Sequence, residues 1–335
     1  MLFGNKLLPA GRRFAAGIDV SQREVRLAVL SRHARLRGAP VRVEWLGVAP
    51  LAAGAMSGVN IVDRTAVAAA IGAVFAQWRE RRSQRMLPCA MAVPGSATAI
   101  ASVALARAQD AQGGALERLE PAVLAQAERV AGLERHAMAL DWFVDDGGGA
   151  YGAPPDAGVP SGAARVTIAA AARQHVEARV EAAAAAGVVL SAVDGEPPAA
   201  LRALCHAAEL EFERGERYAA IWIGGDGIYG WRIGDKSVEA RMRYPSPEFA
   251  DLATALRGLA HGDQLDWALA GGEIGLLDSV GFTLADVGDL LGCMVLPFEC
   301  APFCQGASGC QAPPEWQHAP TFALAFGLAL RGVSE

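Results

Sequence analysis

The chain carries one short pattern twice, and this repeat constrains its fold more than any other feature. The first copy covers residues 14–30 and the second covers residues 219–233. Each copy has an apolar strand-forming run, a short polar or glycine turn and a second strand, which is the pattern of a β-hairpin. A third apolar run, residues 267–270, ends at a glycine pair. The sequence therefore predicts two similar halves, each built on a hairpin.

The two hairpins differ at the residue that matters most for phosphate chemistry. Backbone N–H groups at a tight turn can bind phosphate oxygens where no side chain blocks them. An acidic residue at the end of the preceding strand can hold Mg²⁺ through water. Asp19 has this position in the first hairpin, whereas Trp222 has it in the second. An indole neither ligates Mg²⁺ nor accepts a proton. We therefore expect the second hairpin to lack the metal-binding function that Asp19 could serve in the first.

Composition sets the broad class of protein. A chain of 335 residues is long enough for two domains with cores of their own, and its 52% hydrophobic and 20% charged residues exclude a disordered chain. The formal net charge of −6 argues against nucleic-acid binding. Every apolar run is shorter than the ~20 residues of a membrane-spanning helix, and the N-terminus does not resemble a signal peptide. We expect a cytoplasmic protein.

The cysteines invite a zinc interpretation that their spacing does not favour. Cys300, Cys304 and Cys310 precede His318, but the paired C-x2-C spacing typical of zinc sites is absent from this stretch. Reduced thiols of a cytoplasmic protein are the simpler interpretation.

Between the hairpins, helical and strand patterns alternate. Asp63 is expected to cap a helix over residues 64–80, whose apolar residues fall on one face. A second amphipathic helix is predicted over residues 116–131, and the Gly- and Pro-rich residues 145–162 predict a loop. This alternation in both halves indicates an α/β protein with layered sheets.

Several motifs, in order along nearly the whole chain, resemble the PilM-type family of type IV pilus assembly proteins, relatives of the division actin homologue FtsA. The opening Gly-Ile-Asp-hydrophobic motif is residues 17–20, and an "AVPG" turn is residues 92–95. A "VDvE"-like turn is residues 193–196, and the typical ending is residues 325–332. Each motif is weak alone, but their order and spacing make the resemblance specific.

The resemblance implies an α/β, actin-like fold with duplicated RNase H-like halves. On that basis the first half is residues 1–194, with an inserted small subdomain at about residues 88–164. The second half is residues 195–335, with a small subdomain at about residues 232–265.

The resemblance also implies a cleft for ATP and Mg²⁺. Asp19 is the metal position, and Asp19 and Asp194 are the acids of an active site, if the site is active. The positions that match the family's cofactor contacts are Asp19, Ser21, Gln22, Arg23, Gly224, Gly225, Asp226, Gly271, Gly272 and Glu273.

Departures from the family pattern leave two hypotheses about the nucleotide. The first turn, residues 21–24, places bulk and an acid where phosphate would rest, and Trp222 replaces an aspartate. One hypothesis is a binding protein whose ATP site has decayed. The other is a working ATPase or nucleotide-gated switch, in which Asp226 could replace the lost acid and Arg23 could pair with a phosphate. Of these, a role without catalysis is favoured.

The partners that the resemblance implies belong to the type IV pilus machine. They are the platform at the inner membrane and, above all, the N-terminal cytoplasmic peptide of a bitopic PilN-like protein, bound in a groove beside the inserted subdomain. The chain would then be a scaffold in twitching motility, peripheral to the inner membrane through its partner, and a homodimer is a further expectation. A membrane-associated division actin is a weaker alternative, because only four residues follow Arg331.

Overall fold

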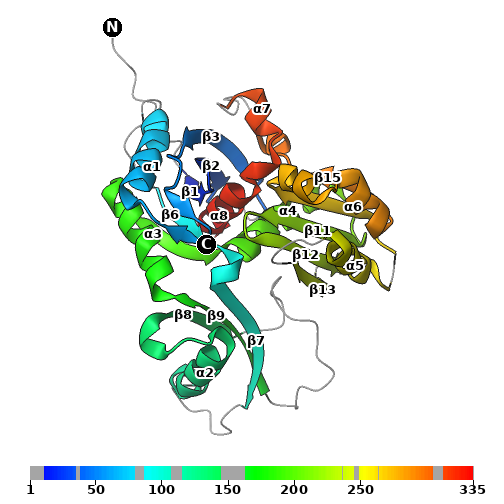
Figure 1. Ribbon diagram of the computed structural model, residues 1–335, viewed down its shortest axis with the longest axis horizontal. Helices are drawn as coiled ribbons and strands as arrows, with labels where there is room; N and C mark the ends of the chain where they lie inside the picture. Colours follow the sequence, from blue (N-terminus) through cyan, green and yellow to red (C-terminus); the bar gives the residue numbers. More distant parts are fainter. Residues whose placement is uncertain are drawn as a thin grey trace.

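The computed structural model describes residues 11–34, 38–79, 87–106, 115–144, 163–235, 237–244, 249–262, 264–304 and 312–334. Two five-stranded sheets form the two sides of the molecule in Figure 1. The first sheet has the order β10-β6-β1-β2-β3 and the second has the order β13-β12-β11-β14-β15. The strands of the first are β1 (Arg12–Val20), β2 (Glu24–His33), β3 (Arg42–Pro50), β6 (Cys89–Val93) and β10 (Leu190–Gly195). Those of the second are β11 (Tyr218–Gly224), β12 (Gly227–Gly234), β13 (Ser237–Tyr244), β14 (Trp267–Gly272) and β15 (Met294–Pro297).

The two sheets have the same connectivity. In each, the first three strands pair as an antiparallel meander, and the next two strands add in parallel on the other side of the first. The predicted hairpins are β1–β2 and β11–β12, and both are confirmed. The duplication expected from the repeated pattern is therefore a property of the fold.

Helices cover the outer faces and fill the space between the sheets. On the first sheet, α1 (Arg64–Arg79) and α3 (Arg173–Ala185) pack over one face, and α5 (Phe249–Ala260) and α6 (Leu284–Leu291) pack over the second sheet. Two helices, α4 (Glu196–Glu211) and α8 (Ala323–Ser334), lie between the sheets, with α8 at the centre of Figure 1. The remaining short elements are β4 (Met56–Ser57), β5 (Asn60–Ile61), α7 (Pro314–Gln317) and the 3₁₀ turns η1 (Gly95–Ala97), η2 (Arg135–Ala137), η3 (Ile274–Val280), η4 (Ala301–Cys304) and η5 (Pro320–Phe322).

Local sequence signals explain where several helices begin. The carboxylate of Asp63 accepts a hydrogen bond from the Ala66 amide at 2.9 Å, so the predicted cap of α1 is confirmed. In α6, Thr283 and Asp286 form a reciprocal capping box. Helix α4 begins at Glu196, and proline follows directly in its first turn. Proline is favoured there because the backbone N–H groups of the first turn have no partner within the helix, so the N–H that proline lacks is not missed.

A third, separate sheet is inserted between β6 and β10. Its order is β7-β9-β8, from β7 (Thr98–Ala106), β8 (Met138–Val144) and β9 (Ala163–Ala172), and α2 (Ala115–Ala131) packs on one face. Val123 and Ala127 of α2 contact Val166 and Ile168 of β9 within one small core. The unit extends away from the rest of the molecule in Figure 1. The loop predicted over residues 145–162 lies outside the described residues.

Close helix packing makes Gly327 of α8 a position where a side chain has no room. A Cβ there would overlap the carbonyl oxygen of Ala199 in α4. We expect Gly327→Ala to lower the free energy of unfolding by about 1–3 kcal/mol through overpacking, measured by urea denaturation. The matched control is Gly258→Ala in α5, where a Cβ meets nothing within 4 Å. That change should stabilise by roughly 0.5–1 kcal/mol, and equal effects of the two would contradict this view of α8.

Candidate functional site

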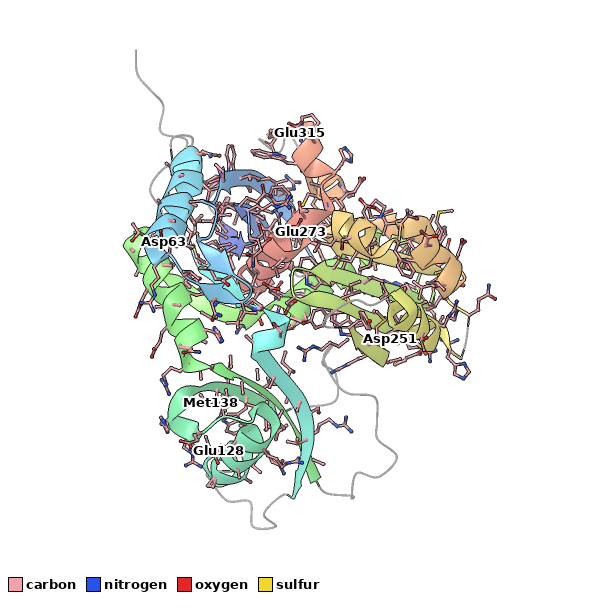
Figure 2. The ribbon with its side chains drawn as sticks, viewed as in Figure 1. Asp63, Glu128, Met138, Asp251, Glu273 and Glu315 are labelled. Carbon is pink, nitrogen blue, oxygen red and sulfur yellow. The ribbon has the colours of Figure 1, made fainter. Side chains whose placement is uncertain are left out.

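Most of the residues singled out in the sequence meet where the two halves face each other. The turn of β1–β2, the turn of β11–β12 and the end of β14 converge there, together with η1 and the start of α4. Glu273 lies near the middle of the molecule, between the halves, in Figure 2. The site is therefore an interface between halves.

At the centre of this site is a cation, Arg26 of β2. It stands directly opposite Asp19 in the β1–β2 register and donates from Nη1 to the Asp19 carboxylate at 3.0 Å. Its Nε donates to Glu24 at 2.6 Å, and its Nη2 donates to Glu273 in the second half. Only 5% of the Arg26 side chain is exposed. One guanidinium thus joins two carboxylates of the first half to one of the second.

Burial and charge act in opposite directions on this cluster. Burial raises the pKa of Asp19 to about 6, while the adjacent Arg26 opposes the rise. Burial also works to lower the pKa of Arg26, but the carboxylates of Asp19 and Glu273 outweigh it and raise that pKa. At neutral pH Arg26 and Asp19 are both charged, and each depends on the other for its compensation.

The first turn uses its own hydrogen-bond donors. Ser21 Oγ accepts from the amides of Arg23 and Glu24 at 3.3 and 3.2 Å, and donates to the Glu24 carbonyl at 3.0 Å. Gln22 donates from its side-chain amide to the carbonyl of Gly58 at 2.8 Å. The backbone amides of Arg23 and Glu24 are thus already hydrogen-bonded, in the position where a phosphate-binding turn would present free amides.

The second turn is tied to the first half through Asp226. One oxygen of Asp226 accepts from the Ser96 amide in η1 at 2.5 Å and from the Tyr229 hydroxyl at 3.1 Å. Its other oxygen is buried and has no hydrogen-bond partner within the described residues. Asp226 therefore acts as a second link between the halves.

Trp222 fills the position of the missing acid. Its side chain is 3% exposed and belongs to the central core, with the small residues of α4 packed against the same cluster. The indole nitrogen lies 2.9 Å from the place that a Cβ on Gly224 would occupy, and Asp226 Oδ1 lies 3.1 Å from that place. Gly224 thus leaves the room that the Trp222 and Asp226 side chains need.

The glycine pair at the end of β14 is explained by close packing. Gly272 has φ of +101°, and a Cβ there would overlap the Ile223 carbonyl and lie 2.9 Å from the Trp222 ring. A Cβ on Gly271 would lie 2.9 Å from Ala323 of α8. The Glu273 amide donates to the Ile223 carbonyl at 2.8 Å. The turn is fastened to the neighbouring strand β11.

Two further charged groups border the site at α3 and α4. Burial raises the pKa of Glu196 to about 8, with Asp19 and Asp226 adding to the rise and Arg179 opposing it. Burial lowers the pKa of Arg179, whose Nε donates to the Ala92 carbonyl at 2.5 Å. Asp194, in contrast, pairs with Arg202 at 2.9 Å and lies 3.6 Å from Arg331.

The arrangement is a poor fit to Mg·ATP. A nucleotide site needs an acid free to hold the metal, free backbone donors and a potential that tolerates a polyphosphate. Asp19 is paired, the Ser21 turn is closed on itself, and Trp222 stands in place of the second acid. Several acidic side chains also gather around the cleft, and they are Asp19, Glu24, Glu196, Asp226 and Glu273.

Sequence reasoning missed Arg26, Ser96 and Arg179. Arg26 lies in the apolar run of β2, and a charged residue at a buried strand position needs a partner. The hairpin register places it opposite Asp19, so a cross-strand pair was open to prediction. Ser96 and Arg179 act through backbone contacts across the fold, for which the sequence carries no local signal.

Two sheets of equal connectivity, with helices packed between them, define an actin-like protein. The model of the family described as type IV pilus assembly protein PilM matches residues 17–221, and the chain belongs to this family. A solved PilM-PilN type IV pilus biogenesis complex matches with 20% identity and a TM-score of 0.68, over 95% of this chain and 98% of that one. That likeness shows the fold.

Other matches are more distant. The ethanolamine utilization protein EutJ from Carboxydothermus hydrogenoformans is 14% identical, with a TM-score of 0.44, over 97% of this chain and 91% of that one. No curated protein sequence matches the chain. Within the part of the chain that the structure describes, no helix is long and apolar enough to cross a membrane.

Proposed function

We propose that this PilM-family protein works in pilus assembly as a cytoplasmic binding scaffold whose former nucleotide cleft is filled by its own side chains. The observation that carries the proposal is Arg26, which sits between carboxylates of both halves. In a nucleotide-dependent relative of this fold, Mg²⁺ and phosphates would supply the charges that link the halves. Here a permanently charged side chain supplies one such link.

The proposal predicts that Mg·ATP does not bind. Because Arg26 pairs with Asp19, Trp222 stands in place of the second acid and the Ser21 turn is closed on itself, calorimetric titration with millimolar Mg·ATP should give no binding heat, and the melting temperature should not change. Micromolar binding that disappears in Asp19→Ala would overturn the proposal and revive the ATP-dependent switch.

We further propose that the partner is a PilN-like membrane protein, bound through its N-terminal cytoplasmic peptide. The solved relative named above is a PilM-PilN complex. In this chain the inserted sheet has an apolar surface that suits such a peptide. Ile100 and Phe143 are 38% and 50% exposed. They pair with Ala169 and with Thr167 of β9, so both point to the face opposite α2.

An exposed apolar pair on a sheet face can anchor a peptide through two side chains. We expect Phe143→Ser to weaken binding of the synthetic N-terminal peptide of the cognate PilN-like protein by about tenfold or more, since an apolar anchor contributes ~1.5–3 kcal/mol. Fluorescence anisotropy of the labelled peptide measures this. The matched control is Val189→Ser, which changes a residue that is 66% exposed outside the inserted unit.

Equal loss in both variants, or no loss in Phe143→Ser, would exclude this surface. Binding of the peptide is independent of the nucleotide result, so failure of one proposal leaves the other standing.

A further inference from the structure

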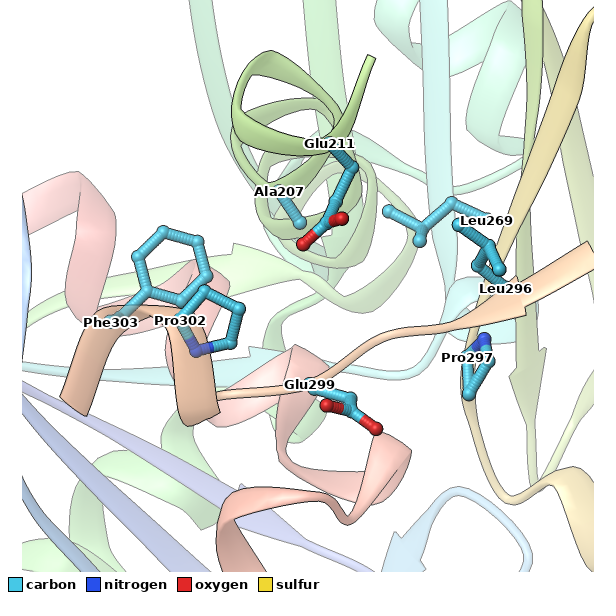
Figure 3. Close-up of a pocket in the computed structure, with 8 residues that line it drawn as sticks. All are labelled: Ala207, Glu211, Leu269, Leu296, Pro297, Glu299, Pro302 and Phe303. Atoms are coloured by element: carbon cyan, nitrogen blue, oxygen red, sulfur yellow. The ribbon is translucent and has the colours of Figure 1, made fainter. Parts of the chain in front are cut away.

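A pocket of about 230 Å³ lies on the second half, between the end of α4 and the segment that follows β15. Figure 3 shows two glutamates on opposite sides of it, Glu211 of α4 and Glu299 after β15. Leu269 and Leu296 form one wall, and Pro302 and Phe303 form another. The nucleotide cleft uses none of these residues, and neither does the surface proposed for the PilN-like peptide.

The walls of the pocket are apolar and firmly supported. Leu269 is 2% exposed and Phe303 is 4% exposed. The Phe303 ring lies 4.7 Å, centroid to centroid, from Phe326 of α8 and 5.5 Å from the ring of His206. The wall formed by Phe303 is thus part of the central core, so the shape of the pocket is set by the fold.

The polar side chains that line the pocket are those of two glutamates, Glu211 and Glu299. Glu211 is the last residue of α4, and its carboxylate points into the space between the walls in Figure 3. The carbonyl end of a helix carries partial negative charge, which adds to the charge of Glu211. One oxygen of Glu299 lies 2.8 Å from His318 Nδ1. Apolar walls below two carboxylates favour a ligand with an apolar stem and a cationic head.

The size of the pocket and the residues around it limit the class of ligand that it can take. Small-molecule sites usually have about 300–1,000 Å³, so this pocket suits a single side chain. Lysine and arginine combine an apolar stem with a charged head. Leu210 and Met294 are 59% and 62% exposed, and they belong to α4 and β15, two of the elements that line the pocket. Met294 and Leu296 are two residues apart in β15, so they point to the same side of the strand.

We propose that this pocket is a second docking site, which takes an arginine or lysine side chain of a protein partner while apolar residues beside that cation cover Leu210 and Met294. Charge complementarity and the exposed apolar rim carry the proposal together. It is independent of the proposed function, since the pocket is separate from the cleft and from the inserted sheet.

The test uses the full chain and two tripeptide probes, acetyl-Leu-Arg-Leu-amide and acetyl-Leu-Gln-Leu-amide, with the ¹³C-labelled Met294 methyl group as NMR reporter. Met294→Leu assigns that signal. We expect the arginine probe to bind with millimolar affinity and to shift the Met294 signal, and the glutamine probe to bind at least about tenfold more weakly. Binding should weaken further as NaCl concentration rises.

The double variant Glu211→Gln, Glu299→Gln should lose this preference for arginine while keeping the wild-type melting temperature, because Glu211 is exposed and the amide oxygen that replaces the Glu299 carboxylate can still accept from His318. Exposed Glu177→Gln on α3 is the matched charge control and should keep the preference. Equal binding of the two probes, or an unchanged preference in the double variant, would overturn the proposal. A Met294 shift caused by CaCl₂ alone and lost in the double variant would overturn it too, in favour of a cation site.

Discussion

Arg26→Ala is expected to lower the free energy of unfolding by about 3–5 kcal/mol, because it leaves buried charge uncompensated. Asp19 is 4% exposed and loses its only cationic partner among the described residues, at 3.0 Å. Glu273 loses the contact that joins it to the first half. Urea denaturation followed by tryptophan fluorescence measures the effect.

A compensated variant separates charge from packing. The triple variant Arg26→Met, Asp19→Asn, Glu273→Gln removes the guanidinium and two of its three carboxylate partners while keeping similar volume, and such replacements are often neutral or stabilising. The third partner, Glu24, keeps its charge, but its side chain is 33% exposed. This triple variant should therefore recover most of the stability that Arg26→Ala loses. A loss below about 1 kcal/mol in Arg26→Ala would contradict the central role of Arg26, since that is the usual range for exposed pairs.

Stability and the proposed loss of nucleotide binding are separate consequences of the same ion pairs. Arg26 links Asp19 to Glu273 across the halves, and in the proposed function it takes the place of an external ligand. The Ser96–Asp226 contact gives a second link between the same halves. Two polar links and a shared apolar core favour one relative position of the halves, which suits a protein that presents fixed surfaces to partners.

Much of this fold was open to prediction from the sequence. The hairpins are local structures whose turns and alternating strands are visible in the sequence, and the cap at Asp63 is decided within one turn of helix. Such features depend on near neighbours only. The repeated hairpin pattern also predicted the duplication of the halves.

The contents of the cleft were harder to predict. Asp19, Asp226 and Glu273 do come to the interface of the halves, but their partners are Arg26, which no motif marks, and the backbone amide of Ser96. Asp194 instead pairs with Arg202, which lies eight residues further along the chain in α4. Partners of buried charges depend on register and on the approach of distant elements, which a motif does not encode.

The remaining prediction concerns Glu196, whose pKa is raised from 4.5 to about 8 by burial and by neighbouring carboxylates. Between these values the folded protein holds a proton that the unfolded chain has released. Stability should therefore fall as pH rises through this range and level off above about 8. Asp19, with its pKa raised to about 6, has the same sign, so it contributes a slope only below about pH 6.

Glu196→Gln should remove the slope between pH 6 and pH 8 and leave the variant more stable than the wild type at pH 8, by roughly 1–3 kcal/mol. A pKa shift from 4.5 to about 8 would correspond to a larger free energy if Glu196 were fully buried. Glu196 retains some contact with solvent, which reduces the expected gain in stability. Urea denaturation at pH 5, 6.5 and 8 measures it, with exposed Glu177→Gln as control. If Glu196→Gln were instead less stable than the wild type at pH 8, the carboxylate would be ionised in the folded state and paired with Arg179. The cleft would then hold two compensated ion pairs, one at Arg26 and one at Arg179.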